Sequence, residues 1–153
     1  MTALSIRRAA ASDAAAVRDL TRTAYAKWCA VIGREPKPMT ADYERAVREH
    51  LVDLAFTADR LVGLIEMIPG AEHLLVENVA VSPDSQGCGI GTRLMRHAEG
   101  VAIQLRLPVV RLYTSKLFAA NVRLYKSLGY RLDREEAYKG GILIHMSKAL
   151  GRR

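Results

Sequence analysis

The chain has 153 residues, of which 50% are apolar and 25% are charged. This composition is typical of one globular domain with a buried core, and it excludes a disordered chain. We expect a single domain over residues 1–153. The formal net charge of +7 favours an anionic partner, but it does not distinguish a nucleotide-like cofactor from a nucleic acid.

No stretch of about 18 apolar residues occurs, and the first residues lack the apolar segment of a signal peptide. The sequence therefore predicts a cytoplasmic protein with no membrane span. Cys29 and Cys88 lack the spacing of metal ligands, so we expect free thiols. We expect no metal site, because the histidines are dispersed along the chain. They are His50, His73, His97 and His145.

The first 50 residues predict one strand and two helices. Leu4–Arg8 alternates weakly, as in a strand, and residues 12–13 can cap a long helix that ends near Gly33. The apolar positions of this helix are Val17, Leu20, Ala24, Trp28 and Val31. Residues 33–39, "GREPKPM", predict a loop, after which Thr40 can cap a second helix. That helix carries Tyr43, Ala46, Val47 and His50.

Three strands are predicted next, at Val52–Phe56, Leu61–Ile68 and Leu74–Val81. The segments between them, "TADR" and "PGAE", are short. Connections of this length join antiparallel neighbours. The sequence therefore predicts an antiparallel meander.

A glycine-rich loop then precedes a helix that is predicted to end at Pro108. Its apolar stripe is Ile90, Leu94, Ala98, Val101 and Leu105. Val109–Tyr113 predicts a strand and Ala119–Leu128 a short helix, which Gly129 can end in the left-handed conformation.

The last two predicted strands, Tyr130–Tyr138 and Ile142–Lys148, flank "KGG" and predict a terminal hairpin. The complete order is strand, two helices, three strands, helix, strand, helix and two strands. This order indicates an α+β fold around a mostly antiparallel sheet, because a doubly wound fold requires regular alternation of strands and helices.

The glycine-rich loop lies within "VSPDSQGCGIGTRLM", residues 81–95. A helix N-terminus presents unpaired N–H groups, and glycines before it allow positive φ and close approach of an anion. The P-loop pattern fails, because Gly91 is followed by Thr92 and Arg93. The Rossmann spacing and context fail as well. A pyrophosphate still suits the loop.

Gln86, Gly89 and Gly91 match the central motif of the GCN5-related N-acetyltransferase superfamily, which the chain resembles over nearly its whole length. The resemblance implies an α/β/α sandwich, with a mostly antiparallel sheet of about seven strands and four helices. It also implies acetyl-CoA as co-substrate and no metal. The residues then expected to bind the cofactor are Val79, Ala80, Val81, Gln86, Gly87, Cys88, Gly89, Ile90, Gly91, Thr92, Asn121 and Tyr125.

A second segment, "NVRLYKSLGY" at residues 121–130, is similar to the family's later motif. Asn121 and Tyr125 are four residues apart, so on a helix they project from the same face. The resemblance implies that both contact the cofactor.

Transfer of an acetyl group to an amine requires a base, stabilisation of the oxyanion and a proton for the departing thiolate. The resemblance implies that an acidic residue on the strand before the loop is the base, which makes Glu77 the first candidate and Glu66 the second. It implies that the N–H of Val79 polarises the thioester and that Tyr125 protonates the thiolate. Cys88 occupies a variable position of the motif and is not expected to be a nucleophile.

By analogy with the family, the acceptor amine is expected between the "GREPKPM" loop and the "KGG" hairpin. The residues available to line this site are Tyr25, Trp28, Tyr43 and Tyr138. The acceptor itself stays open, from a small molecule to a protein amine.

The alternative function is a non-catalytic CoA-binding sensor or partner-binding module. A nucleic-acid-binding domain is disfavoured, because the sequence lacks interleaved aromatic residues and a recognition helix. We also expect a homodimer.

Overall fold

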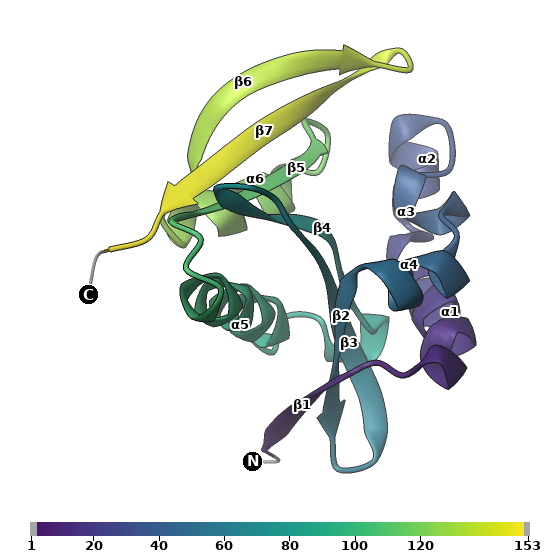
Figure 1. Cartoon of the computed structure of the whole chain (residues 1–153). Helices are drawn as coiled ribbons and strands as arrows, with labels where there is room; N and C mark the ends of the chain where they lie inside the picture. Colours follow the sequence, from purple (N-terminus) through teal and green to yellow (C-terminus); the bar gives the residue numbers. More distant parts are fainter. Residues whose placement is uncertain (1–2, 152–153) are drawn as a thin grey trace.

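The computed structural model describes residues 3–151, and Figure 1 shows a central sheet with helices on both of its faces. The sheet has seven strands in the order β1-β2-β3-β4-β5-β7-β6. Their bounds are β1 Leu4–Arg8, β2 Leu51–Thr57, β3 Arg60–Pro69, β4 His73–Val81, β5 Val109–Ser115, β6 Arg131–Tyr138 and β7 Gly141–Ala149.

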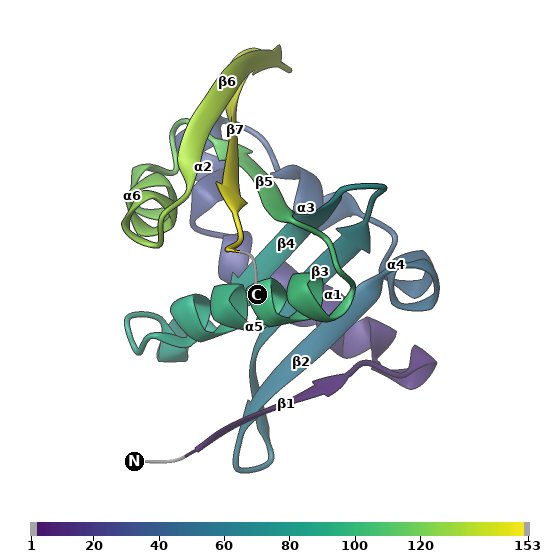
Figure 2. The same ribbon diagram turned by 60° about the vertical axis from the view of Figure 1, so that its left-hand side comes forward.

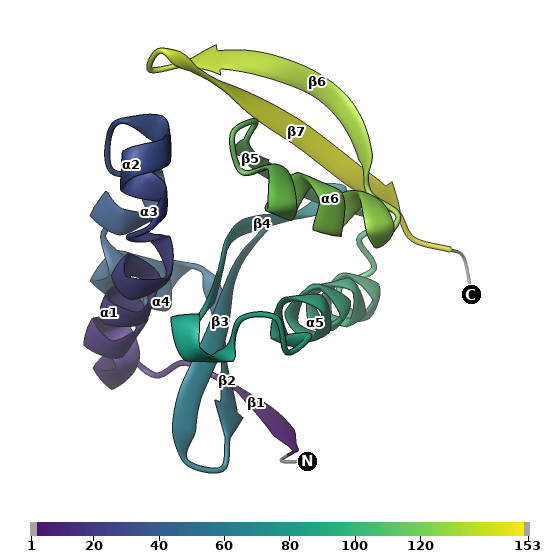
Figure 3. The same cartoon turned by 180° about the vertical axis from the view of Figure 1, so that it is seen from behind.

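Helices α1 to α4 cover one face of the sheet, and α5 and α6 lie on the other (Figures 1 and 3). Figure 2 shows α5 crossing its face, where it contacts β3, β4 and β5. The helix bounds are α1 Ala14–Tyr25, α2 Trp28–Ile32, α3 Lys37–Thr40, α4 Tyr43–Glu49, α5 Ile90–Gln104 and α6 Ala119–Ser127.

Adjacent strands pair antiparallel everywhere except between β4 and β5. The predicted meander, terminal hairpin and mostly antiparallel sheet are therefore confirmed. The parallel pairing joins residues 73–76 of β4 to residues 109–112 of β5 and goes no further. Both strands continue beyond these residues, so the sheet opens between them from Glu77 and Tyr113 onward.

A bulge in β4 lies at the start of this opening. Glu66 pairs with Asn78 and Met67 with Val76, which leaves Glu77 as the extra residue. An extra residue reverses the alternation of side chains along a strand. Val76 accordingly belongs to the apolar core under α5, whereas Ala80 belongs to the core under α1 and α4. The bulge therefore removes Glu77 from the regular ladder.

Each face of the sheet has its own apolar core. The core under α5 and α6 includes Ile65, Met67, Leu94, Met95, Val122 and Met146. The core under α1 and α4 includes Val17, Tyr43, Val52, Leu54 and Leu64. Burial of these side chains holds both helix layers against the sheet.

Glu99 is a buried carboxylate of α5 that contacts the C-terminal part of the chain. It accepts a hydrogen bond from Tyr130 at 3.0 Å and pairs with Lys148 at 3.1 Å. A buried carboxylate without such partners is strongly destabilising. These contacts therefore hold α5 to the β6–β7 hairpin.

The first predicted helix is wrong in length. The backbone remains helical at Ala26, but the Cys29 N–H bonds the Ala26 carbonyl at 3.3 Å, three residues back. This tighter turn separates α1 from α2. Gly33 ends α2 with a φ of 74°, as predicted.

The predicted loop at 33–39 and its Thr40 cap are also wrong. Part of the loop forms α3, because Pro38 in the first turn has a φ that suits a helix. Asp42 caps α4 instead, accepting a hydrogen bond from the Arg45 N–H at 3.1 Å. The described residues therefore contain six α-helices instead of four.

The predicted apolar stripe of α5 is buried from Ile90 to Val101, but Leu105 lies beyond the end of the helix and is exposed. Gly129 follows α6 with a φ of 98°, which confirms the predicted left-handed end. Both cysteines are free.

Candidate active site

A cavity of about 400 Å³ lies between the end of β4 and the N-termini of α5 and α6. It brings together the residues predicted to bind the cofactor, with Cys88 as the exception. Those lining it are Val79, Ala80, Val81, Gln86, Gly87, Gly89, Ile90, Gly91, Thr92, Asn121 and Tyr125. Cys88 is exposed and does not line the cavity. We call this space the cofactor cavity.

The glycine loop has the backbone that an anion site requires. Gly87 and Gly89 have φ values of 82° and 81°, and Gly89 is the N-cap of the 15-residue helix α5. Only glycine adopts this conformation without strain, and the first N–H groups of the helix have no intrahelical partners. The loop and the helix dipole together favour a negatively charged group at the cavity wall.

Gln86 holds the loop in position. Its Nε2 donates to the Val81 carbonyl at 3.1 Å, and its Oε1 accepts from the Lys27 ammonium at 2.7 Å. Lys27, which no sequence motif indicates, adds a cation to the cavity wall. Its position between α1 and α2 depends on the break in the first predicted helix.

Tyr125 lines the same cavity from α6. Its hydroxyl has no hydrogen-bond partner within residues 3–151, and burial raises its pKa to about 12. The ring packs edge-on against Tyr130, with 6.2 Å between centroids. A protonated phenol with an unused O–H therefore lies in the cofactor cavity.

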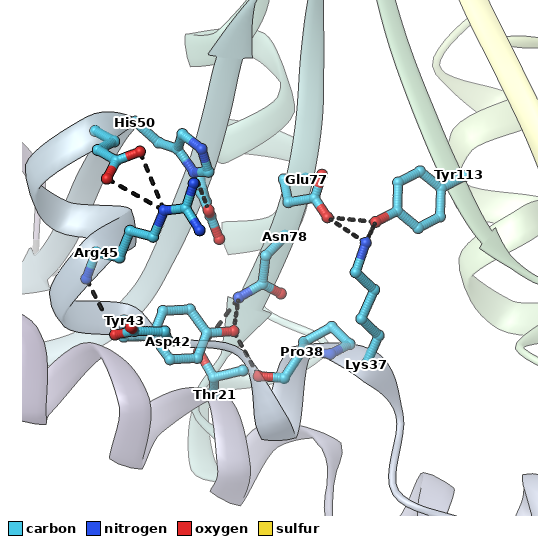
Figure 4. Close-up of polar contacts among 12 residues, drawn as sticks. Thr21, Lys37, Pro38, Asp42, Tyr43, Arg45, His50, Glu77, Asn78 and Tyr113 are labelled. Atoms are coloured by element: carbon cyan, nitrogen blue, oxygen red, sulfur yellow. Dashed lines mark hydrogen bonds and ion pairs between the residues drawn. The ribbon is translucent and has the colours of Figure 1, made fainter.

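Glu77 lies where β4 and β5 separate, in contact with two groups (Figure 4). The Tyr113 hydroxyl donates to its carboxylate, and the Lys37 ammonium of α3 lies 3.3 Å from the same oxygen. Lys37 also donates to the Tyr113 hydroxyl at 3.0 Å. This bond and the Glu77 charge raise the pKa of Lys37, whereas burial and then Glu77 raise that of Tyr113 to about 12. The cluster therefore pairs a carboxylate with an ammonium.

Glu66 is buried on the strand beside Glu77. Its Oε2 shares a hydrogen bond of 2.6 Å with His50 Nδ1. Burial raises the pKa of Glu66, and the interaction with His50 opposes that shift. Glu66 and Glu77 line one cavity of about 360 Å³, which we call the carboxylate cavity.

Asn78 also lines the carboxylate cavity and is only 3% exposed. Its Nδ2 donates to the hydroxyls of Thr21 and Tyr43, each at 3.3 Å. These hydroxyls use their own hydrogens elsewhere: Thr21 donates to the Val17 carbonyl at 2.8 Å and Tyr43 to the Pro38 carbonyl at 2.6 Å. Both oxygens can therefore only accept from Asn78, which fixes the orientation of its amide.

The Asn78 Oδ1 is consequently left without a hydrogen-bond donor in the described part of the chain. Figure 4 shows this oxygen directed away from Thr21 and Tyr43. A buried carbonyl oxygen without a donor costs about 1–3 kcal/mol. Buried polar atoms of this kind are uncommon in native proteins.

Tyr25 connects the cofactor cavity to the Glu77 cluster. It lines the cofactor cavity and also a smaller one, of about 70 Å³, that Glu77 and Tyr113 line too. Its hydroxyl donates to the Val79 carbonyl at 3.2 Å. In an antiparallel ladder the N–H and C=O of one residue point to the same side. This bond therefore indicates that the Val79 N–H faces the opening between β4 and β5.

The sequence model of the acetyltransferase (GNAT) family matches residues 15–130. The chain belongs to the GNAT acetyltransferase family. None of the curated protein sequences matches this GNAT chain.

Solved structures share its fold over nearly the whole length. An IAA acetyltransferase from Bacillus cereus is 20% identical with a TM-score of 0.76, and the match covers 97% of this chain and 100% of the other. PaiA N-acetyltransferase from Thermoplasma acidophilum, in complex with coenzyme A, is 17% identical with a TM-score of 0.77 and coverages of 97% and 99%. The ribosomal-protein-S18-alanine N-acetyltransferase from Escherichia coli is 16% identical, with a TM-score of 0.76 and coverages of 99% and 96%.

The aromatic residues predicted for the acceptor site of this GNAT domain do not all lie together. Trp28 lines the cofactor cavity, where its ring packs on Phe118 with 4.3 Å between centroids. Tyr138 lines the smaller cavity, and Tyr43 lines the carboxylate cavity. Tyr25 lines both the cofactor cavity and the smaller cavity.

Lys37, Asn78 and Tyr113 belong to the site although they were not predicted from the sequence. Asn78 did carry a signal, because two adjacent polar residues, Glu77 and Asn78, interrupt an otherwise apolar strand. Lys37 and Tyr113 carried none, since they are 76 residues apart and the fold brings them together. Within residues 3–151, no helix is both long and apolar enough to cross a membrane.

Proposed function

We propose that the protein is an acetyl-CoA-dependent N-acetyltransferase that transfers the acetyl group to a primary amine by direct attack in a ternary complex. One observation carries this proposal: the cofactor cavity, with its glycine loop and free tyrosine hydroxyl, is connected through Tyr25 to a carboxylate at Glu77. Membership of the GNAT family and the coenzyme A bound to one structural neighbour support it.

Acetyl-CoA is the expected occupant of the cofactor cavity. The free N–H groups at the start of α5 and of the loop would bind its pyrophosphate, with Lys27 as a nearby cation. Asn121 and the end of β4 line the wall along which the pantetheine would extend. The Val79 N–H would bind the thioester oxygen as it becomes negative, as a backbone oxyanion donor.

Glu77 is the proposed general base. An alkyl ammonium has a pKa near 10.4, so its proton must be removed before attack at neutral pH. In the free chain the Lys37 ammonium already lies 3.3 Å from this carboxylate, which supports the site's ability to bind an acceptor ammonium. We prefer Glu77 to Glu66, because Glu66 is already hydrogen-bonded by His50.

Tyr125 is the proposed proton donor to the departing thiolate. Burial raises the pKa of Tyr125 to about 12, well above the ordinary thiol pKa near 8.5, so complete proton transfer from the phenol to the thiolate is unfavourable. Its principal contribution is therefore expected to be a hydrogen bond to the sulfur as charge develops there. The neutral amine nitrogen would form the new C–N bond while the C–S bond breaks, and the second proton that this nitrogen then loses would pass to the departing thiolate. No covalent enzyme intermediate is required.

The test is release of free thiol from acetyl-CoA in the presence of a panel of primary amines. Glu77→Gln should lower kcat/KM by at least about 100-fold, the usual contribution of a general base. Glu72→Gln changes an exposed carboxylate outside the cavities and serves as the control. A chain that binds acetyl-CoA but acetylates no amine would instead be the non-catalytic CoA-binding module. Cytoplasmic location and a homodimer stay predictions.

A further inference from the structure

We propose that the chain acetylates its own Lys37, which reacts in cis with bound acetyl-CoA when no other amine occupies the site. This inference rests on the proposed acetyltransferase function and adds a modification site to it. It depends on the contact between the Lys37 ammonium and the proposed base, on the flexible stem of this side chain and on the cavity that Lys37, Glu77 and Tyr25 line together.

The Lys37 nitrogen lies where the nitrogen of an acceptor is required. It is 3.3 Å from the Glu77 carboxylate and 3.0 Å from the Tyr113 hydroxyl (Figure 4). The hydrogen bond with Tyr113 and the charge of Glu77 raise the pKa of Lys37, whereas burial opposes that shift. A raised pKa keeps this nitrogen protonated at neutral pH, so its acetylation requires Glu77 to take the proton.

The stem of Lys37 can carry the nitrogen from Glu77 towards the cofactor cavity. Lys37 is the first residue of α3 and its side chain is 55% exposed, and a four-carbon lysine stem is flexible. The cavity of about 70 Å³ that Lys37 and Glu77 line reaches Tyr25, which also lines the cofactor cavity. Val79, whose N–H is the proposed oxyanion donor, follows Glu77 by about 7 Å along β4. Rotation of one side chain therefore suffices to bring the amine to the opening between β4 and β5.

Lys37 differs from the other lysines in its partner. Lys27 lines the cofactor cavity but contacts the neutral amide of Gln86. Lys116 pairs with Glu135, which lines none of the three cavities described above. Among the lysines that the structure describes, Lys37 alone contacts the proposed base. The geometry therefore selects one lysine for the reaction.

In the proposed step Glu77 takes one proton from the Lys37 ammonium. The neutral nitrogen forms an amide bond with the acetyl carbon while the C–S bond breaks, its second proton passes to the departing thiolate, and free CoA leaves. Acetyl-CoA is the only co-reactant. The acetylated side chain is neutral, so it no longer forms the ion pair that occupies Glu77 in the free chain.

The test is peptide mass mapping of the purified chain after incubation with acetyl-CoA and no added amine. Lys37 should be acetylated at least about ten-fold faster than Lys116, because only Lys37 is positioned at the base, and the rate constant should not depend on the protein concentration. Acetyl phosphate, a chemical donor that lacks the CoA moiety, should show no preference for Lys37.

Glu77→Gln should slow the acetylation of Lys37 by at least about ten-fold. Lys37 of this variant should also stay unmodified in a mixture with the unaltered chain, because the reaction is in cis. Glu72→Gln, which changes an exposed carboxylate, should leave the rate intact. Thermal unfolding shows that both variants are folded.

Three results overturn the inference and leave the acetyltransferase proposal standing, provided that the chain acetylates added amines. They are acetylation of Lys37 no faster than that of Lys116, an unchanged rate in Glu77→Gln, and transfer to Lys37 of Glu77→Gln from the unaltered chain. Bound acetyl-CoA with acetylation of neither Lys37 nor any added amine overturns both proposals.

Discussion

Tyr125→Phe tests the chemistry with the smallest possible change. The Tyr125 hydroxyl has no partner within residues 3–151, and the ring packing against Tyr130 does not depend on it. Removing the oxygen should therefore change the free energy of unfolding by less than about 0.5 kcal/mol. If the hydroxyl stabilises the departing thiolate, the lost charge-assisted hydrogen bond is worth about 1.5–3 kcal/mol. That range corresponds to a loss of roughly 10- to 150-fold in kcat.

Tyr130→Phe is the matched control. The Tyr130 hydroxyl donates to the buried Glu99 carboxylate at 3.0 Å, outside the cofactor cavity. This variant should lose about 1.5–3 kcal/mol of stability and keep its kcat. Thiol release from acetyl-CoA and urea unfolding measure the two effects separately. A Tyr125→Phe variant with the kcat of the unaltered chain would refute the role of the Tyr125 hydroxyl as hydrogen-bond donor to the departing sulfur.

Three further predictions concern the loop, the base and the tyrosines. Gly89→Ala requires an alanine at a φ of 81°, which costs about 1–2 kcal/mol. The loop should therefore adopt its anion-binding conformation less readily, and acetyl-CoA should bind about ten-fold more weakly. The control is Gly91→Ala, whose Cβ would meet only Leu124 at 3.7 Å; this variant should bind acetyl-CoA normally. Fluorescence of the single tryptophan, which lies in the cofactor cavity, measures the affinity of both variants for acetyl-CoA. Lys37→Met removes the ammonium that forms a half-exposed ion pair with Glu77 and so competes with the acceptor amine for that carboxylate. The variant should therefore lower KM for the amine about three- to five-fold without changing kcat. An unchanged KM in steady-state kinetics would mean that Lys37 does not compete with the acceptor. The free energy of unfolding should fall between pH 10 and pH 12, because tyrosines with a raised pKa in the folded state stabilise it fully only below their unfolded pKa of 10.0. Urea unfolding that shows no loss of stability across this range would contradict the raised pKa values. The tyrosines concerned are Tyr25, Tyr43, Tyr113, Tyr125 and Tyr130.

The cofactor cavity was predictable because its determinants are local. Gly87 and Gly89 need positive φ, and the strand before them and the helix after them follow from apolar periodicity. Asn121 and Tyr125 share a helix face by their spacing alone. These residues line one cavity as the sequence analysis expected, although their roles stay predictions.

The Glu77 cluster was only partly predictable. The sequence indicates a costly charge in an apolar strand, but the bulge that removes Glu77 from the ladder depends on pairing with β3. Lys37 reaches Glu77 because residues 37–40 form a helix where a loop was predicted. Tyr113 reaches it because β4 and β5 stop pairing one residue earlier. Such contacts arise from tertiary structure and have no local signal.

The helix errors have a similar origin. A continuous apolar period from Val17 to Val31 predicts one helix, yet Val31 is 48% exposed and α1 ends at Tyr25. Periodicity identifies which residues can share a face, but it does not reveal a change from one hydrogen-bonding pattern to another. The break matters for function, because Lys27 lies within it and holds Gln86 of the glycine loop.

Calorimetric titration of the purified chain with acetyl-CoA measures binding at the cofactor cavity directly, because it needs no knowledge of the acceptor. We expect saturable binding at one site per chain, competition by free CoA, and weaker binding by Gly89→Ala than by Gly91→Ala. Absence of binding at millimolar acetyl-CoA, by a chain that unfolds cooperatively, would contradict it.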